Sequence, residues 1–122
     1  TANVGGAQAR DACAGFGLRL VRVDTIAENT FLWETASSRF GDFWIGAQVV
    51  ADGTRRWRWV DGTEFWEGTL GGSSVDGLFA AWEMDQPDDD APPSCAVARD
   101  RMLGRWHDTG CATTIDYVCE YY

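Results

Sequence analysis

Four cysteines constrain this chain more than any other feature of its sequence. Cys13, Cys95, Cys111 and Cys119 allow three different pairings. No two of them form a C-x-x-C pair, and His107 is the single histidine, so a zinc site is disfavoured. Two disulfides are the better interpretation. They predict an oxidising compartment, and so a secreted or cell-surface protein.

The chain is strongly acidic, and this excludes some classes of partner. Its formal net charge is -9 at pH 7, and it lacks the basic patch that a nucleic-acid-binding protein needs. Anionic membranes are disfavoured for the same reason, and no apolar run suits a bilayer, so we expect no membrane insertion. The surplus of acid suits calcium, which prefers oxygen ligands, but it also suits solubility alone.

The basic residues are unusual in kind. All ten of them are arginine, and alanine, glycine and aspartate are abundant. This composition is typical of GC-rich coding, and it predicts a bacterial source without indicating a mechanism.

Hydrophobic patterning predicts one α+β domain, residues 1–122, with an irregular segment inside it. An alanine-rich helix is expected over 6–14, and a second helix follows Thr25 and Glu28, which fit a capping box. Residues 18–23 are expected to form a short strand or an extended segment, and strands are expected at 43–47, 56–60, 95–98, 105–107 and 117–121. Residues 66–94 lack periodicity, and a loop of that length inside a domain is usually functional or disordered.

Short motifs in a fixed order extend over nearly the whole chain. They are Cys13, Trp44-Ile45-Gly46, Trp57-x-Trp59-Val60-Asp61-Gly62, Trp82-x-x-x-Gln86-Pro87-Asp88, Cys95, Gly104-Arg105-Trp106-His107-Asp108, Cys111 and Tyr117-Val118-Cys119-Glu120. Each motif is weak alone, but the ordered set resembles the C-type lectin domain family.

The resemblance implies a particular fold and a particular disulfide pairing. Two helices would flank antiparallel sheets, and a long central loop would project from one end. The irregular segment 66–94 occupies the place of that loop. Cys13 would pair with Cys119, and Cys95 would pair with Cys111.

The resemblance also places a calcium-dependent sugar site at the tip of the loop. A cis peptide before Pro87 would turn the side chains of Gln86 and Asp88 toward one ion. These two residues and Asp108 would supply oxygen ligands, and vicinal hydroxyls of the sugar would complete the shell. The Gln-Pro-Asp order matches the galactose-type motif of the family, where mannose-type members have Glu-Pro-Asn.

Two positions depart from the family's calcium-binding pattern. Pro93-Ser94 replace a Glu-Asp pair, and His107 replaces an asparagine, although imidazole is a poor calcium ligand. Asp89 and Asp90 are candidates to restore oxygen, and His107 would donate an N–H to a sugar hydroxyl. The expected metal ligands are Gln86, Asp88, Asp90 and Asp108. The expected sugar contacts are Gln86, Asp88, His107 and Asp108.

The seven tryptophans have two expected roles. Four of them fall in expected strands and should be core residues: Trp44, Trp57, Trp59 and Trp106. Trp82 is expected in the core of the loop. Trp66 or Phe79, beside or within the loop, could instead cover the apolar face of a sugar.

These observations leave two functions open. One is a calcium-dependent lectin for galactose-like sugars on extracellular glycans. The other is a calcium-independent domain of the same fold that binds an extracellular protein or joins an extracellular assembly. An enzyme is not expected, because there is no nucleophile elbow and no Ser-His-Asp pattern, and nothing places two carboxylates in a cleft.

Overall fold

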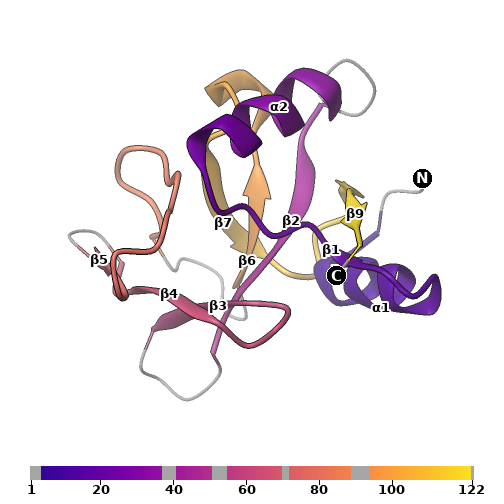
Figure 1. The fold of residues 1–122 in the computed structure, drawn as a ribbon, viewed down its shortest axis with the longest axis horizontal. Coiled ribbons are helices and arrows are strands. Elements are labelled where there is room, and N and C mark those ends of the chain that lie inside the picture. The colour runs from indigo at the N-terminus through magenta and orange to yellow at the C-terminus, as the bar shows by residue number, and fades with distance from the viewer. Residues whose placement is uncertain (1–3, 37–40, 51–54, 70–71, 89–93, 122) are drawn as a thin grey trace.

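The computed structural model (Figure 1) describes most of the chain, namely residues 4–36, 41–50, 55–69, 72–88 and 94–121. Its elements in chain order are α1 (Gly6–Gly15), β1 (Arg19–Leu20), α2 (Ile26–Ala36), β2 (Phe43–Val49), β3 (Arg56–Trp59), β4 (Glu64–Glu67), β5 (Ser73–Ser74), β6 (Ser94–Ala98), a 3-10 turn (Asp100–Met102), β7 (Trp106–Gly110), β8 (Asp116–Tyr117) and β9 (Cys119–Glu120). None of the helices in these ranges has the length and apolar character needed to cross a membrane.

Most strands belong to one sheet, whose order is β5-β4-β3-β2-β6-β7. Neighbours along this order are antiparallel, and β8 joins β2 in parallel. A second, two-stranded sheet pairs β1 with β9, so that Leu20 lies opposite Cys119. Figure 1 shows α1 beside β1 and β9, whereas β3, β4 and β5 extend away from it. This α+β arrangement of two helices and antiparallel sheets confirms the expected fold.

Both helices begin at residues that satisfy their first backbone N–H groups. At α1, the side chain of Gln8 accepts a hydrogen bond from the N–H of Gly5 (2.8 Å). At α2, Thr25 Oγ1 accepts from the N–H of Glu28 (3.1 Å), as the capping box predicts. The Glu28 carboxylate accepts from Asp24 (2.7 Å), one residue earlier than the reciprocal bond of a regular capping box.

The β2–β3–β4 meander follows from alternation in the sequence. Trp57 and Trp59 are buried, whereas Arg56 and Arg58, between and beside them, are exposed. The chain reverses after β3 at Gly62, whose φ of +93° suits a residue without a Cβ. The N–H of Gly62 donates to the carbonyl of Trp59 (2.9 Å), which closes the turn.

An aromatic cluster fills the core beneath this meander. Trp59 stacks on Phe65 with ring centroids 4.5 Å apart, and Trp106 meets Trp59 edge-on at 5.5 Å. Trp82, which comes from the loop, packs edge-on against Trp57 at 4.9 Å. The expected core tryptophans are confirmed, because each has an exposed fraction of 2% or less: Trp44, Trp57, Trp59 and Trp106.

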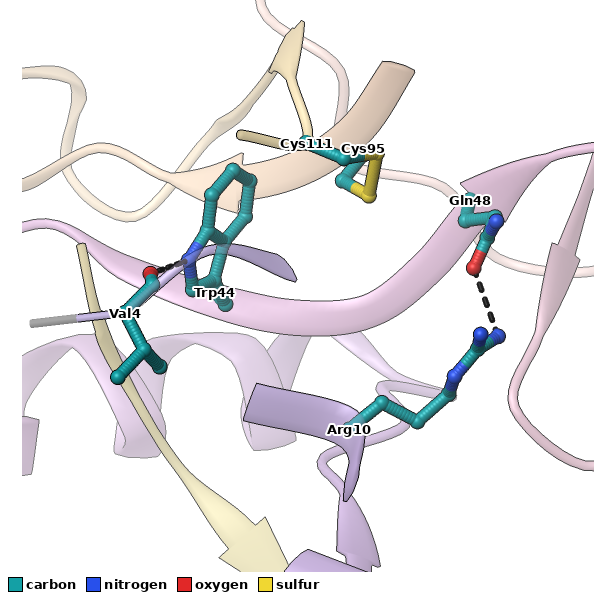
Figure 2. The surroundings of a disulfide bond; sticks show 6 residues. All are labelled: Val4, Arg10, Trp44, Gln48, Cys95 and Cys111. Atoms are coloured by element: carbon teal, nitrogen blue, oxygen red, sulfur yellow. Dashed lines mark hydrogen bonds between the residues drawn. A yellow bond between two sulfur atoms is a disulfide. The ribbon is translucent and has the colours of Figure 1, made fainter. Parts of the chain in front are cut away.

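A second cluster packs α1 against β1, β2 and β6, and all four cysteines belong to it or pack against it. Trp44 lies within it and donates its indole N–H to the carbonyl of Val4 (2.7 Å), as Figure 2 shows. Two disulfides join residues 106 and 16 positions apart: Cys13–Cys119 and Cys95–Cys111. This is the pairing that the family resemblance implies.

The segment 66–94 is less irregular than its sequence suggests. β4 continues to Glu67, and β5 pairs with it so that Trp66 lies opposite Ser74. Both residues of β5 are exposed serines, so no hydrophobic alternation announces this strand. The other described residues of the segment, 68–69, 72 and 75–88, contain no further named strand.

Candidate functional site

The segment 86–88 is positioned by backbone hydrogen bonds to the start of β7. The N–H of Trp106 donates to the carbonyl of Ala81 (2.9 Å), and the N–H of Glu83 donates to the carbonyl of Trp106 (3.0 Å). A further bond from the N–H of Gln86 to the carbonyl of Glu83 (3.0 Å) turns the chain. These bonds place segment 86–88 beside Asp108, two residues along β7 from Trp106.

Three of the predicted site residues meet there. The N–H of Asp88 donates to Asp108 Oδ1 (2.9 Å), and the N–H of Asp108 donates to Gln86 Oε1 (3.4 Å). The Gln86 amide in turn donates to Asp88 Oδ2 (3.4 Å). The peptide bond between Gln86 and Pro87 is cis. We call Gln86, Asp88 and Asp108 the oxygen cluster.

Burial within the oxygen cluster is uneven. Asp108 is only 8% exposed, and Pro87 is buried, whereas Gln86 and Asp88 are half-buried. Buried carboxylates need partners, and the backbone N–H of Asp88 supplies one for Asp108. Asp108 therefore anchors the oxygen cluster on its buried side, whereas Gln86 and Asp88 remain partly accessible to solvent.

His107 takes a different partner from the one expected. Its Nε2 contacts a carboxylate oxygen of Glu83, and both side chains are about 21% exposed. The structure thus does not bring His107 into the oxygen cluster. Its role as a donor to a sugar hydroxyl stays a prediction.

The other candidate ligands, Asp89 and Asp90, lie outside the described residues, as does Pro93 of the Pro93-Ser94 replacement. Ser94, which begins β6, is fully buried, and its Oγ has no hydrogen-bond partner in the described part of the chain. Where the family pattern has an acid beside the third cysteine, this chain therefore has an enclosed hydroxyl.

The oxygen cluster fits calcium in the kind of its donors. It offers two carboxylates and one amide oxygen, which are hard ligands, and two carboxylates balance a divalent charge. The described residues contain no group of three or more His, Cys, Asp or Glu side chains that could hold a metal ion, so among them a third side-chain oxygen beside Asp88 and Asp108 comes from the Gln86 amide. A carboxylate has about four lone-pair sites, so one accepted hydrogen bond does not prevent coordination.

The two aromatic candidates for sugar stacking are both partly engaged. Trp66 is half-buried, and its indole N–H donates to the carbonyl of Gly68 (3.1 Å). Phe79 is half-buried and meets Trp106 edge-on at 5.8 Å. Both pack against the main core, so each offers only part of its surface to a ligand.

Glu83 is the residue of this region that the sequence did not single out. It contacts His107 across 24 positions, because the chain around Trp82 runs beside Trp106. The only signal in the sequence is that an acid stands three residues before Gln86. Nothing in that spacing indicates a pairing with β7.

Comparison with known proteins assigns the family. The model of the "Lectin C-type domain" matches residues 4–121. The chain belongs to the C-type lectin domain family. Domains of this family bind carbohydrate and are generally not enzymes.

The similar curated proteins are much longer than this chain. Mouse C-type lectin domain family 4 member F is 32% identical over 119 residues, which cover 93% of this chain and 19% of that lectin. Human C-type mannose receptor 2 is 26% identical over 109 residues, which cover 89% of this lectin domain and 6% of the receptor.

Solved structures agree on the fold. The carbohydrate-recognition domain of cow CD23, determined in the presence of a GlcNAc2Man3 oligosaccharide, has a TM-score of 0.74 and 24% identity. The match covers 97% of this chain and 79% of that one. Herring type II antifreeze protein has the same TM-score and identity, covering 97% and 83%. The fold therefore does not by itself specify a ligand.

Proposed function

We propose that this chain is an extracellular glycan-binding domain that holds calcium at Gln86, Asp88 and Asp108 and prefers galactose-type sugars. The observation that carries the proposal is the set of hydrogen bonds, two from backbone N–H groups and one between side chains, that joins these three residues from two segments 20 positions apart. Calcium would supply coordination sites for two vicinal hydroxyls. The same side chains would hydrogen-bond those hydroxyls.

Sugar preference rests on the order of acid and amide around Pro87. Gln86 before Asp88 reverses the Glu-Pro-Asn order of mannose-type members, so donors and acceptors around the ion exchange places. A site that pairs specific hydroxyls disfavours sugars that leave its polar groups unpaired. Galactose-like sugars should therefore bind better than mannose, with millimolar affinity.

Calcium binding is tested by calorimetric titration of Asp88→Asn. The substitution removes one of two carboxylate charges, and we expect calcium affinity to fall roughly tenfold or more. Asp85→Asn is the matched control, because it makes the same chemical change at an exposed residue three positions before Asp88. Its φ of +67° is tolerated by asparagine. Equal calcium affinity in wild type and Asp88→Asn would show that calcium does not bind at this site.

Sugar choice is tested by exchanging the motif. Gln86→Glu combined with Asp88→Asn keeps one carboxylate and one amide, so calcium binding should persist while preference shifts from galactose to mannose. A glycan array with and without a chelator measures both. Galactose binding that survives the chelator, or equal binding of the two sugars by wild type, would contradict the mechanism.

The alternative function is a calcium-independent domain that binds an extracellular protein. The contact of Glu83 with His107 favours it, because this contact occupies one nearby carboxylate that a metal could use. If wild type binds neither calcium nor any sugar on the array, the protein-binding function replaces the lectin proposal.

A further inference from the structure

A cavity of about 280 Å³ lies between α1 and the β2–β3 hairpin. Its lining includes Trp44 and Cys95 and three polar side chains that we call the polar wall: Arg10, Gln48 and Arg58. Figure 2 shows the hydrogen bond between Arg10 and Gln48 in the surroundings of the Cys95–Cys111 disulfide. None of the lining residues belongs to the oxygen cluster.

The polar wall presents N–H donors. Arg10 Nη1 donates to Gln48 Oε1 (2.8 Å), which uses one of the five N–H groups of the guanidinium (Figure 2). Because Gln48 already accepts with its oxygen, its NH₂ group remains as a donor. Arg58 lies opposite Gln48 on the adjacent strand, so the two side chains share one face of the sheet.

The charge of the polar wall is uncompensated. Neither Arg10 nor Arg58 has a carboxylate partner within the ranges that the structure describes. The one acid among the lining residues is Asp61, which already pairs with Arg22 (2.6 Å) and Arg19 (3.4 Å). Although the chain has a net charge of -9, neither of these two guanidinium groups beside the cavity pairs with an acid among the described residues.

We propose that this cavity binds the oxyanion of an acidic sugar, a sulfate or a carboxylate, between Arg10 and Arg58. Guanidinium groups match such oxyanions because their N–H donors form a planar fork. The volume is near the small end of ligand sites, which suits one charged monosaccharide. Calcium takes no part, so the site is independent of the function proposed for the oxygen cluster.

The test is a titration without calcium, at ionic strength held constant with chloride. Galactose 6-sulfate, galacturonic acid, inorganic sulfate and uncharged galactose are the probes, and affinity is followed by amide NMR shifts. We expect the two acidic sugars to bind and to shift the amides of residues 46–48. Arg58→Gln and Arg10→Gln should each weaken them about tenfold, because each removes charged hydrogen-bond donors.

The matched control is Arg56→Gln. Arg56 is two residues from Arg58 on the exposed face of β3 and makes the same change of charge, but it pairs with Glu64 (3.3 Å) and does not line the cavity. The affinity of the Arg56→Gln variant for the acidic sugars should stay within twofold of the wild-type affinity. Equal weakening by Arg56→Gln would show a diffuse charge effect and overturn the site.

Two further arms separate the possible sources of the anion. If inorganic sulfate binds as tightly as galactose 6-sulfate, the sugar part of the proposal is overturned. If uncharged galactose produces the same shifts, the oxyanion part is overturned. Asp88→Asn should bind acidic sugars like wild type, so loss of the calcium site and loss of this site are measured separately.

Discussion

Asp61 lies in the turn after β3 and forms ion pairs with Arg19 and Arg22. Burial opposes ionisation of its carboxyl, but hydrogen bonds from Thr63 and Arg22 outweigh that effect and lower the pKa of Asp61 below its ordinary 3.8. A folded pKa below the unfolded value stabilises the fold above pH 3.8. This stabilisation is lost as the pH falls through the folded pKa.

We therefore expect Asp61→Asn to destabilise the protein at pH 7 by on the order of 1 kcal/mol. The difference from wild type should shrink as the pH falls below 3.8 and through the lowered folded pKa, because protonation makes the wild-type carboxyl as uncharged as the asparagine amide. Urea denaturation at several pH values measures it. Asp76→Asn, at an exposed aspartate without a recorded ion pair among the described residues, is the control and should show a smaller effect. A difference that grows toward low pH would contradict the assignment.

Individual residues of the oxygen cluster were predictable where the signal was local. Gln86, Pro87 and Asp88 are consecutive in the sequence, so their proximity in space follows from the motif itself. Asp108 was placed beside them only through the family resemblance. The partner of His107 was missed because it depends on how the loop crosses the start of β7.

At the scale of elements, the N-terminus of α2 depends on a side-chain cap. Thr25→Ala removes the acceptor for the N–H of Glu28, and we expect a loss of about 1 kcal/mol in the free energy of unfolding. Thr30→Ala makes the same change at an exposed position within α2, where alanine is the better helix former. Chemical denaturation should show the cap variant destabilised and the Thr30 variant unchanged or stabilised. The reverse order would argue against the cap.

Elements with strong periodicity were predicted well, and those without it were not. β3 was evident because tryptophan and arginine alternate over 56–59. β5 was not, because two exposed serines pair with β4 through backbone bonds alone. The short strand or extended segment expected over 18–23 is a regular strand only at β1, and beyond it the N–H of Val21 donates to the carbonyl of Val118 (3.0 Å). Tertiary contacts decided these cases.

For the whole molecule, the two disulfides should differ in their contribution to stability. Cys13–Cys119 closes a loop of 106 positions and Cys95–Cys111 one of 16. The chain-entropy model predicts about 5 kcal/mol for the longer loop and about 3 kcal/mol for the shorter. Paired Cys→Ala variants, compared by denaturant unfolding, measure this. A larger loss from the shorter bridge would show that strain or packing outweighs loop entropy.

Membership of the family accounts for the overall fold but leaves the source of the chain open. The two curated relatives compared above are mammalian, so the bacterial source inferred from the arginine bias stays a prediction. The matched regions are 6% and 19% of those proteins, which contain far more than one such domain's length. Partners of any larger assembly are therefore proposals.

The Cys13–Cys119 bridge also determines how the molecule responds to tension. A force applied through the chain before Cys13 and after Cys119 passes across one covalent bond, so it cannot extend the residues between these two cysteines. Fully stretched, that interval would span about 350 Å. While oxidised, the domain should behave as a link of nearly fixed length. Reduction would turn the same link into an extensible tether, and the length released in a pulling experiment would report the redox state.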